Sequence, residues 1–168
     1  LGQDPYINSK IENGLEIPQA TGLAFSVPED FKQPPSLKNI FKEIKNEYGN
    51  FKIPKSGNLD RWVQEERILL LNTALTVKKG LSNSHQKKWG EITNKVIQYI
   101  SDNCEKVIFL LLGNNAKSKV NFIDIKKHKV ISGIHPSPLS ANRGFFSSNI
   151  FKKINEELIK SNKNEIKW

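Results

Sequence analysis

VISGIHPSPLSANRGFF, residues 130–146, contains the sharpest change of local pattern in the chain. Its first part, residues 130–134, is an apolar run typical of a buried strand, and His135 follows directly. Two prolines separated by one serine can continue neither a strand nor a helix, so we expect a stiff loop there. Leu139 is unusual in such a loop, because it must either fold back into the core or contact a partner. A histidine that ends a buried strand and opens a rigid, hydroxyl-bearing loop is typical of a ligand site.

Similar apolar runs occur at 67–72 and 107–112, and each predicts a strand that is buried on both faces. Amphipathic patterns predict helices at 36–48, 59–66, 89–100, 116–125 and 147–161. Ser36 is expected to cap the first of these helices. Segment 7–21 lacks a strong period and is interpreted as an ordered loop. The alternation of strands and helices predicts an α/β fold with a parallel sheet that is covered on both faces.

Polar residues follow each predicted strand of this sheet. Asn72 ends the first segment, Gly113 and Asn114 follow the second run, and His135 follows the third. Asp4, in a tight Gly-Gln-Asp-Pro corner, would join them if a strand precedes it. Because the carboxyl ends of parallel strands meet at one edge, where open α/β sheets bind ligands, we expect these side chains to lie close together.

Composition narrows the class of protein. A chain of 168 residues is expected to form one domain, and its net charge of +9 favours an acidic partner such as nucleic acid. Lysine enrichment by mutation bias in an AT-rich genome is the alternative. Cys104 is the single cysteine, which excludes an internal disulfide or a multi-cysteine zinc site. No apolar run has membrane-spanning length and no secretory signal pattern occurs, so we expect a soluble intracellular protein. His128, within a lysine-rich run, is expected on the surface.

Several motifs together resemble family 1 uracil-DNA glycosylases. In the family's order they are GQDPY (2–6), GLAFSV (22–27), PPSL (34–37), LLLN (69–72), HPSPLS (135–140) and RGFF (143–146). The resemblance covers nearly the whole chain. It implies a three-layer α/β/α fold with a central, mostly parallel four-stranded sheet, whose first strand is largely missing from the chain. It also implies that residues 1–168 are a single domain without the family's N-terminal helical region.

The resemblance assigns the catalytic roles to Asp4 and His135. Asp4 would orient or deprotonate the attacking water and stabilise the cationic sugar of the transition state. His135 would donate a hydrogen bond to uracil O2 as negative charge develops there, and a neutral imidazole suffices for that role. No metal ion and no cofactor are implied.

The resemblance also implies a pocket for the extruded base. Asn72 would pair with uracil N3–H and O4, an arrangement that cytosine mismatches. Phe25 would stack on the base, and Tyr6 would occupy the space that a thymine methyl group needs. Gln3 would add polar or backbone contacts.

Contacts to the DNA strand are assigned on the same basis. Ser36, Ser137 and Ser140 would hold phosphate groups, and Arg143 would add electrostatic attraction. Leu139 would fill the base stack that the extruded nucleotide leaves.

The chain departs from the family pattern at several positions. Ile7 stands where a histidine is usual, and segment 7–21 is longer than usual, which puts the positioning of water at Asp4 in doubt. Leu112 replaces a usual tryptophan and Asn114 a usual serine, which puts one phosphate contact in doubt.

The expected function is therefore a monomeric DNA-repair glycosylase that excises uracil from single- and double-stranded DNA and leaves an abasic site. The alternative is a non-catalytic DNA-binding or scaffold module on the same fold. Tyr6 disfavours a glycosylase of wider specificity. A protein inhibitor of such enzymes is a further expected partner. The expected location is the cytoplasm, at the nucleoid, in a bacterium, or the nucleus or mitochondrion in a eukaryote.

Overall fold

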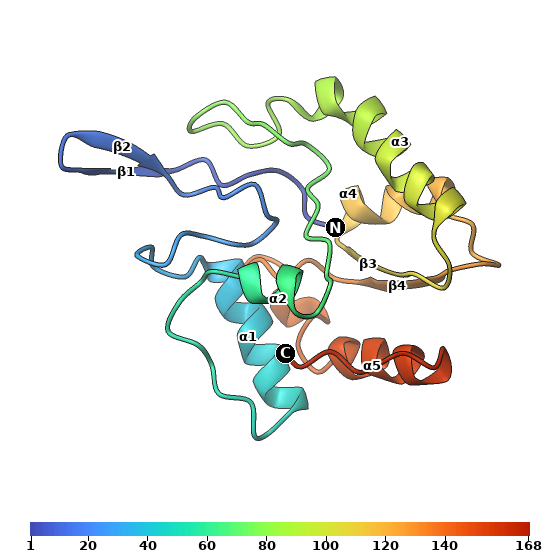
Figure 1. Ribbon diagram of the computed structural model, residues 1–168. Helices are drawn as coiled ribbons and strands as arrows, with labels where there is room; N and C mark the ends of the chain where they lie inside the picture. Colours follow the sequence, from blue (N-terminus) through green and yellow to red (C-terminus); the bar gives the residue numbers. More distant parts are fainter.

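A computed structural model describes residues 1–168 as a mixed α/β fold (Figure 1). In chain order, its elements are β1 (Ser9–Glu12), β2 (Leu15–Pro18), α1 (Pro35–Glu47), α2 (Asp60–Gln64), α3 (Gln86–Asn103), β3 (Ile108–Leu112), α4 (Asn114–Lys117), the 3₁₀ turn η1 (Ser118–Phe122), β4 (Lys129–Gly133), the 3₁₀ turn η2 (Ala141–Arg143) and α5 (Ile150–Lys160). The predicted α/β class is confirmed. None of the helices combines the length and the apolar character that a membrane crossing requires.

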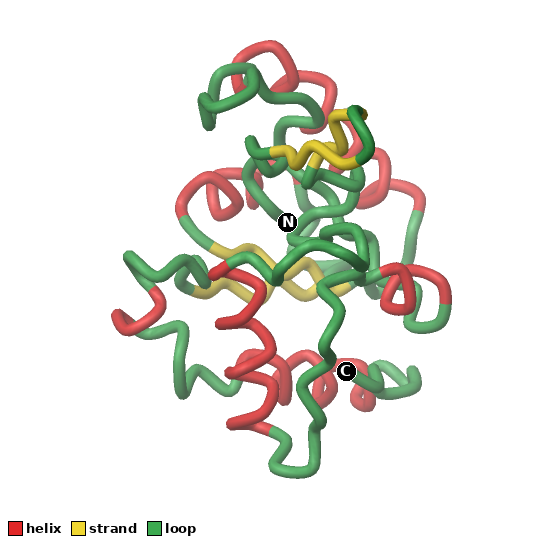
Figure 2. The backbone as a smooth tube through the Cα atoms, turned by 90° about the vertical axis from the view of Figure 1, so that its left-hand side faces the viewer, coloured by secondary structure: helices red, strands yellow, loops and turns green.

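The parallel pair β3 and β4 forms the centre of the fold. Phe109 and Leu111 of β3 join a hydrophobic cluster with Ile97 of α3, whereas Leu112 joins the main core on the other face. Side chains of a strand alternate between its two faces, so each face of this sheet has its own cluster. Figures 1 and 2 show helices on both sides of the strands, which is the predicted layered arrangement.

Segment 67–72 does not form the regular strand that its apolar run predicted. Leu69 is 59% exposed, and the segment makes only an isolated parallel bridge, between Gly2 and Asn72. The backbone nitrogen of Gly2 donates to Leu71 O at 2.8 Å, and that of Leu1 donates to Leu110 O of β3 at 2.7 Å. Extended segments therefore continue the sheet beyond β3 without a continuous ladder, and the regular sheet has only β3 and β4 as strands.

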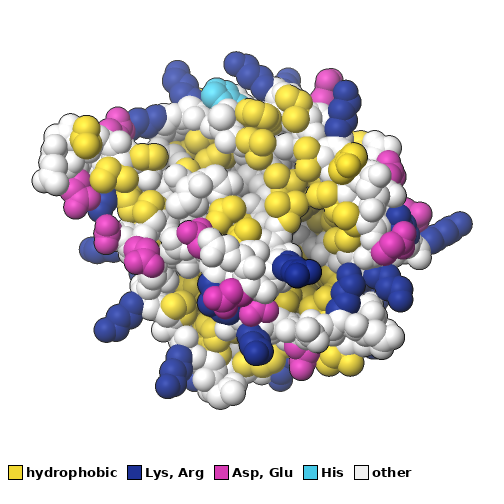
Figure 3. Space-filling view, in the orientation of Figure 1, with side chains coloured by type: hydrophobic (Ala, Val, Ile, Leu, Met, Phe, Trp, Pro, Cys, Tyr) yellow, Lys and Arg dark blue, Asp and Glu magenta, His cyan; other side chains and the backbone are white.

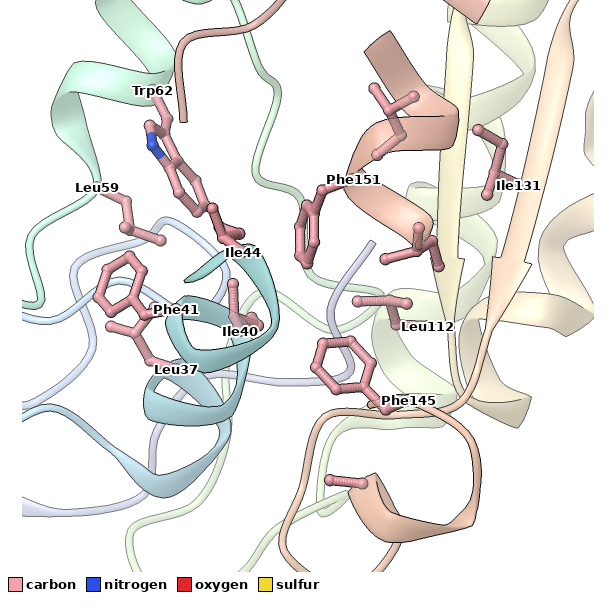
Figure 4. Close-up of a cluster of buried hydrophobic side chains, with 13 residues drawn as sticks. Leu37, Ile40, Phe41, Ile44, Leu59, Trp62, Leu112, Ile131, Phe145 and Phe151 are labelled. Atoms are coloured by element: carbon pink, nitrogen blue, oxygen red, sulfur yellow. The ribbon is translucent and has the colours of Figure 1, made fainter. Parts of the chain in front are cut away.

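The main core lies between α1, α2 and one face of the sheet (Figure 4). Leu37 and Ile44 of α1 are fully buried, as is Phe145 from the loop before α5. Phe41 meets Trp62 of α2 edge to face, with ring centroids 6.0 Å apart. Because Phe145 belongs to the same stretch as His135, this core anchors the loop that carries the predicted site residues.

Two buried carboxylates of α1 hold the N-terminal end of α5. Glu43 accepts hydrogen bonds from the backbone N–H groups of Ser147 and Ser148 at 3.0 and 2.9 Å. Glu47 accepts from the N–H groups at the start of α5, and burial raises its pKa to about 6. Carboxylates stabilise a helix N-terminus by pairing its free N–H groups and opposing its dipole. The prediction that Ser36 caps α1 was wrong, because Pro34 holds the N-cap position.

Segment 7–21 contains a hairpin rather than the predicted loop. Strands β1 and β2 pair antiparallel around a turn at Asn13 and Gly14, both with positive φ. Ile11 and Leu15 are 80% and 70% exposed, and Figure 3 shows hydrophobic side chains on this projection at the left of the view. The hairpin extends away from the layered body in Figure 1 and adds little to the core.

His128 is buried, contrary to the prediction of a surface position. Its Nδ1 accepts the backbone N–H of Val107 at 3.1 Å, and its Nε2 lies 2.7 Å from the carbonyl oxygen of Ser101. The imidazole thus carries its proton on Nε2 and joins the start of β4 to α3 and β3. Satisfied hydrogen bonds at both ring nitrogens allow a polar ring to be buried among lysine-rich neighbours.

Candidate active site at the carboxyl edge of the sheet

The Gln3–Asp4 corner is fixed by the segment that follows Asn72. Gln3 O accepts hydrogen bonds from Ala74 N at 2.9 Å and from the Thr73 hydroxyl at 2.8 Å. Beyond this anchor, the Asp4 carboxylate turns toward the loop between Thr76 and α3. Its Oδ2 accepts from the Ser82 hydroxyl at 2.9 Å and from Asn83 N at 2.6 Å. The carboxylate is therefore held in one orientation while remaining partly exposed.

Asn72 presses closely against Gly2. The amide side chain is 6% exposed, and a Cβ atom added to Gly2 would lie 2.3 Å from Asn72 Oδ1. Only glycine fits at this position, because the Cβ atom of any other residue would clash with the Asn72 amide oxygen. The glycine of the Gly-Gln-Asp-Pro corner thus determines where the Asn72 amide lies.

Tyr6 and Phe25 are linked by a hydrogen bond. The Tyr6 hydroxyl donates to Phe25 O at 3.1 Å, and burial raises the pKa of Tyr6, so the phenol remains a donor. Phe25 has φ of +66°, which is uncommon for an aromatic residue and costs conformational energy. Its ring centroid lies 6.0 Å from that of His135, with the rings tilted by 43°. The strained backbone therefore presents the Phe25 ring beside the imidazole.

His135 lies just beyond β4 with its protonation state defined by its neighbours. The backbone N–H of Ser137 donates to its Nδ1 at 3.1 Å, and burial lowers the pKa of the imidazole. A neutral ring that accepts at Nδ1 carries its proton on Nε2, which is then available as a donor. Gly113, at φ of +86°, lies so close that an added Cβ would be 3.0 Å from His135 Cβ.

Several hydrogen bonds hold the loop after His135. The Ser137 and Ser140 hydroxyl oxygens lie 2.9 Å apart, and Ser140 also donates to His135 O at 2.8 Å. Asn39 of α1 donates to Pro136 O at 2.8 Å, which ties the loop to the helix that carries Ser36. Leu139, by contrast, is 86% exposed. Of the two sequence alternatives for this leucine, the structure excludes burial in the core.

A small cavity of about 140 Å³ opens where β3 and β4 end. Gln3, His135 and residues 112–116 line it, including the departures from the family pattern at Leu112 and Asn114. The other predicted catalytic and base-binding residues do not line this cavity; they are Asp4, Tyr6, Phe25 and Asn72. Arg143 is exposed in η2, away from these contacts. No group of three or more His, Cys, Asp or Glu side chains comes together as a metal site requires.

Some residues of the site were not predicted from the sequence. Ser82 and Asn83 contact the Asp4 carboxylate, and Asn39 holds the loop after His135. Asn39 could have been suspected, since it is a polar residue one turn after Ser36 on α1. No local pattern marks Ser82, because its partner lies 78 residues away in sequence.

A fixed carboxylate, a buried amide, an imidazole with a lowered pKa and a neighbouring aromatic ring lie near one another at this edge of the sheet. The model of the uracil DNA glycosylase superfamily matches residues 1–159. The chain belongs to this superfamily. The resemblance seen in its motifs is therefore confirmed.

Individual relatives agree with this membership. The chain is 47% identical to the uracil-DNA glycosylase of Clostridium beijerinckii and 48% identical to that of Aliarcobacter butzleri; each match covers all of this chain, and 71% and 74% of the relatives. The crystal structure of mimivirus uracil-DNA glycosylase superposes with a TM-score of 0.92 at 34% identity, over 99% of this chain and 65% of the viral one. A variant of the viral enzyme has been solved in complex with UGI. The comparisons support uracil excision from DNA, a hydrolytic step of base-excision repair, as the activity of the chain.

Proposed function

We propose that the chain hydrolyses the N-glycosidic bond of deoxyuridine in single- and double-stranded DNA, releasing uracil and leaving an abasic site. One observation carries the proposal. The Nδ1 atom of His135 accepts a hydrogen bond from Ser137, which leaves the Nε2 proton free to donate to a ligand, and the Phe25 ring lies beside the imidazole. The target nucleotide must leave the duplex stack first, at a cost of a few kcal/mol.

Bond cleavage places positive charge on the sugar and negative charge on the departing base. Asp4 stabilises the sugar cation and orients the water that attacks C1′. His135 donates from Nε2 to uracil O2, where negative charge accumulates. Burial lowers the pKa of His135 and favours the neutral ring. The ring therefore stabilises the uracil anion as a neutral hydrogen-bond donor rather than as a cation.

Selectivity rests on pairing and on volume. Asn72 offers a donor and an acceptor to uracil O4 and N3–H, and cytosine would leave these groups unpaired. Phe25 stacks on the base, and Tyr6 excludes the thymine methyl group. Gln3, which lines the cavity beside His135, adds polar contacts.

The outer residues hold the DNA strand. Ser36, Ser137 and Ser140 contact phosphate groups, and Arg143 adds positive charge. Leu139, which projects into solvent, fills the space that the extruded nucleotide leaves.

We further propose that the protein acts as a monomer, inside the cell where its DNA substrate resides. UGI, the partner in the viral complex, is a candidate inhibitor of this chain as well.

A cleavage assay tests the proposal. Matched oligonucleotides that carry one U, T, C or abasic site are incubated with the chain and with Asp4→Asn as the control. Uracil-specific release that falls by orders of magnitude in the control is the expected result. Binding to uracil or abasic DNA without release would overturn the proposal and favour the non-catalytic DNA-binding module.

A further inference from the structure

The two oxygens of the Asp4 carboxylate have unequal surroundings. Oδ2 accepts strong hydrogen bonds from the Ser82 hydroxyl, at 2.9 Å, and from Asn83 N, at 2.6 Å. Oδ1 has only the Gln3 amide at 3.3 Å, a long and weak contact. One oxygen is thus occupied by the protein, and the other is left to accept from a ligand or from water.

The donors belong to a turn that is itself constrained. In the loop 78–84, the nitrogen of Lys78 donates to the Ser84 hydroxyl at 2.7 Å, and Lys78 forms an antiparallel bridge with Leu81. Asn83 has φ of +63°, a left-handed conformation that asparagine tolerates better than most residues. The backbone N–H of Asn83 that donates to Asp4 comes from this left-handed residue.

The projecting hairpin braces the same loop. Gly80 N donates to Ile7 O at 3.2 Å, and Lys79 forms an ion pair with Glu16 of β2. Ile7 thus contributes a backbone contact at the position where the family pattern has a histidine. The loop is attached both to the chain just beyond Asp4 and to the hairpin, which limits how far its donors can move.

We infer that the Ser82 hydroxyl and the Asn83 amide position the Asp4 carboxylate, so that Oδ1 faces the water that attacks C1′. This inference rests on the proposed function. In the step itself, the water oxygen bonds to C1′, the C1′–N1 bond breaks with its electron pair leaving on uracil, and the water proton passes to Oδ1. Ser82 and Asn83 take no proton and form no bond in this step; they are positioning groups that fix the orientation of the carboxylate before the reaction begins.

Ser82→Ala removes one donor without filling space. We expect kcat to fall by about 10- to 100-fold, since small misplacements of a reacting group have costs of that order. The KM for uracil-containing DNA should stay within about twofold, because the only contact of Ser82 with a proposed substrate-binding residue is the weak 3.4 Å hydrogen bond that it accepts from Gln3 Nε2. Ser82→Thr keeps the hydroxyl and should restore most of kcat. Ser56→Ala, which removes a hydroxyl that accepts from Asn58 N in a distant loop, should match the unmodified chain.

Several results would overturn the inference. They are an unchanged kcat in Ser82→Ala, an equal loss in Ser82→Ala and Ser82→Thr, or a loss confined to KM. If the unmodified chain releases no uracil, the proposed function fails. Crystal structures of the unmodified and Ser82→Ala chains then decide the positioning role separately. An Asp4 carboxylate that reorients in the variant supports the positioning role, and one that stays in place refutes it.

Discussion

The backbone N–H of Ser137 donates to Nδ1 of His135 at 3.1 Å, from two residues further along the same loop. This short-range contact, together with burial, favours an imidazole that is neutral and protonated on Nε2. Protonation of Nδ1 would oppose two N–H groups, so the loop resists the charged ring. This hydrogen bond therefore links the tautomer of His135 to the conformation of the loop.

The first prediction concerns this histidine. Because burial lowers the pKa of His135, its ring should titrate with a midpoint below 6.5, and above that pH its proton should reside on Nε2. ¹⁵N NMR of the imidazoles measures both properties, with His135→Gln used to assign the signal among the histidines of the chain. A midpoint above 6.5, or a proton on Nδ1, would contradict the assigned hydrogen bond.

Substitutions at Tyr6 distinguish the effect of its ring volume from that of its hydrogen bond to Phe25 O. Tyr6→Phe keeps the ring and should still reject thymine, although it loses the bond to Phe25 O. Tyr6→Ala opens the space and should release thymine as well as uracil, at a reduced rate. Release from matched U and T oligonucleotides measures the outcome. An alanine variant that still cuts uracil and leaves thymine intact would remove this account of selectivity.

Leu139 should affect activity without affecting stability. Its side chain is 86% exposed, so Leu139→Ala should change the free energy of unfolding by less than about 0.5 kcal/mol. Uracil release from duplex DNA should slow roughly tenfold or more, with a smaller change on single strands that have no stack to refill. Ile159→Ala, at an exposed residue of α5, is the matched control. Equal loss on both substrates would argue against a wedge role.

Glu43 should matter for stability rather than chemistry. Glu43→Gln replaces one carboxylate oxygen with an NH₂ group, so only one of the Ser147 and Ser148 N–H groups keeps its acceptor and the other faces a donor. We expect the free energy of unfolding to fall by about 1–3 kcal/mol, measured by urea denaturation. Lys38→Gln, on the exposed face of the same helix, should change it by less than about 0.5 kcal/mol. Comparable effects of the two substitutions would show that the buried contacts contribute little.

The sequence predicted best where one strong pattern dominates. The run 130–134 and the prolines after His135 located β4 and its rigid loop, since burial and the lack of proline N–H groups act locally. The segment 67–72 failed as a strand, because its apolar character does not reveal whether an adjacent segment pairs with it along its whole length. Leu69 is exposed despite its pattern.

The hairpin and His128 were missed for different physical reasons. The hairpin has an Asn13–Gly14 turn but leaves Ile11 and Leu15 exposed, so no buried face gives its strands an apolar alternation. His128 is buried because the backbone satisfies both ring nitrogens, which neighbouring lysines do not reveal. The Ser82–Asp4 contact depends on two distant turns meeting, and no local signal encodes such a meeting.

The two histidines on either side of β4 make the same kind of hydrogen bond through Nδ1. His128, just before it, and His135, just beyond it, both accept a backbone N–H at Nδ1 and both favour the Nε2 tautomer. At His128 the Nε2 proton meets the Ser101 carbonyl, and the ring becomes a permanent brace. At His135 no carbonyl takes that place. An imidazole that serves as a structural brace and one whose Nε2 proton stays free for a ligand thus differ in whether a backbone carbonyl lies against Nε2.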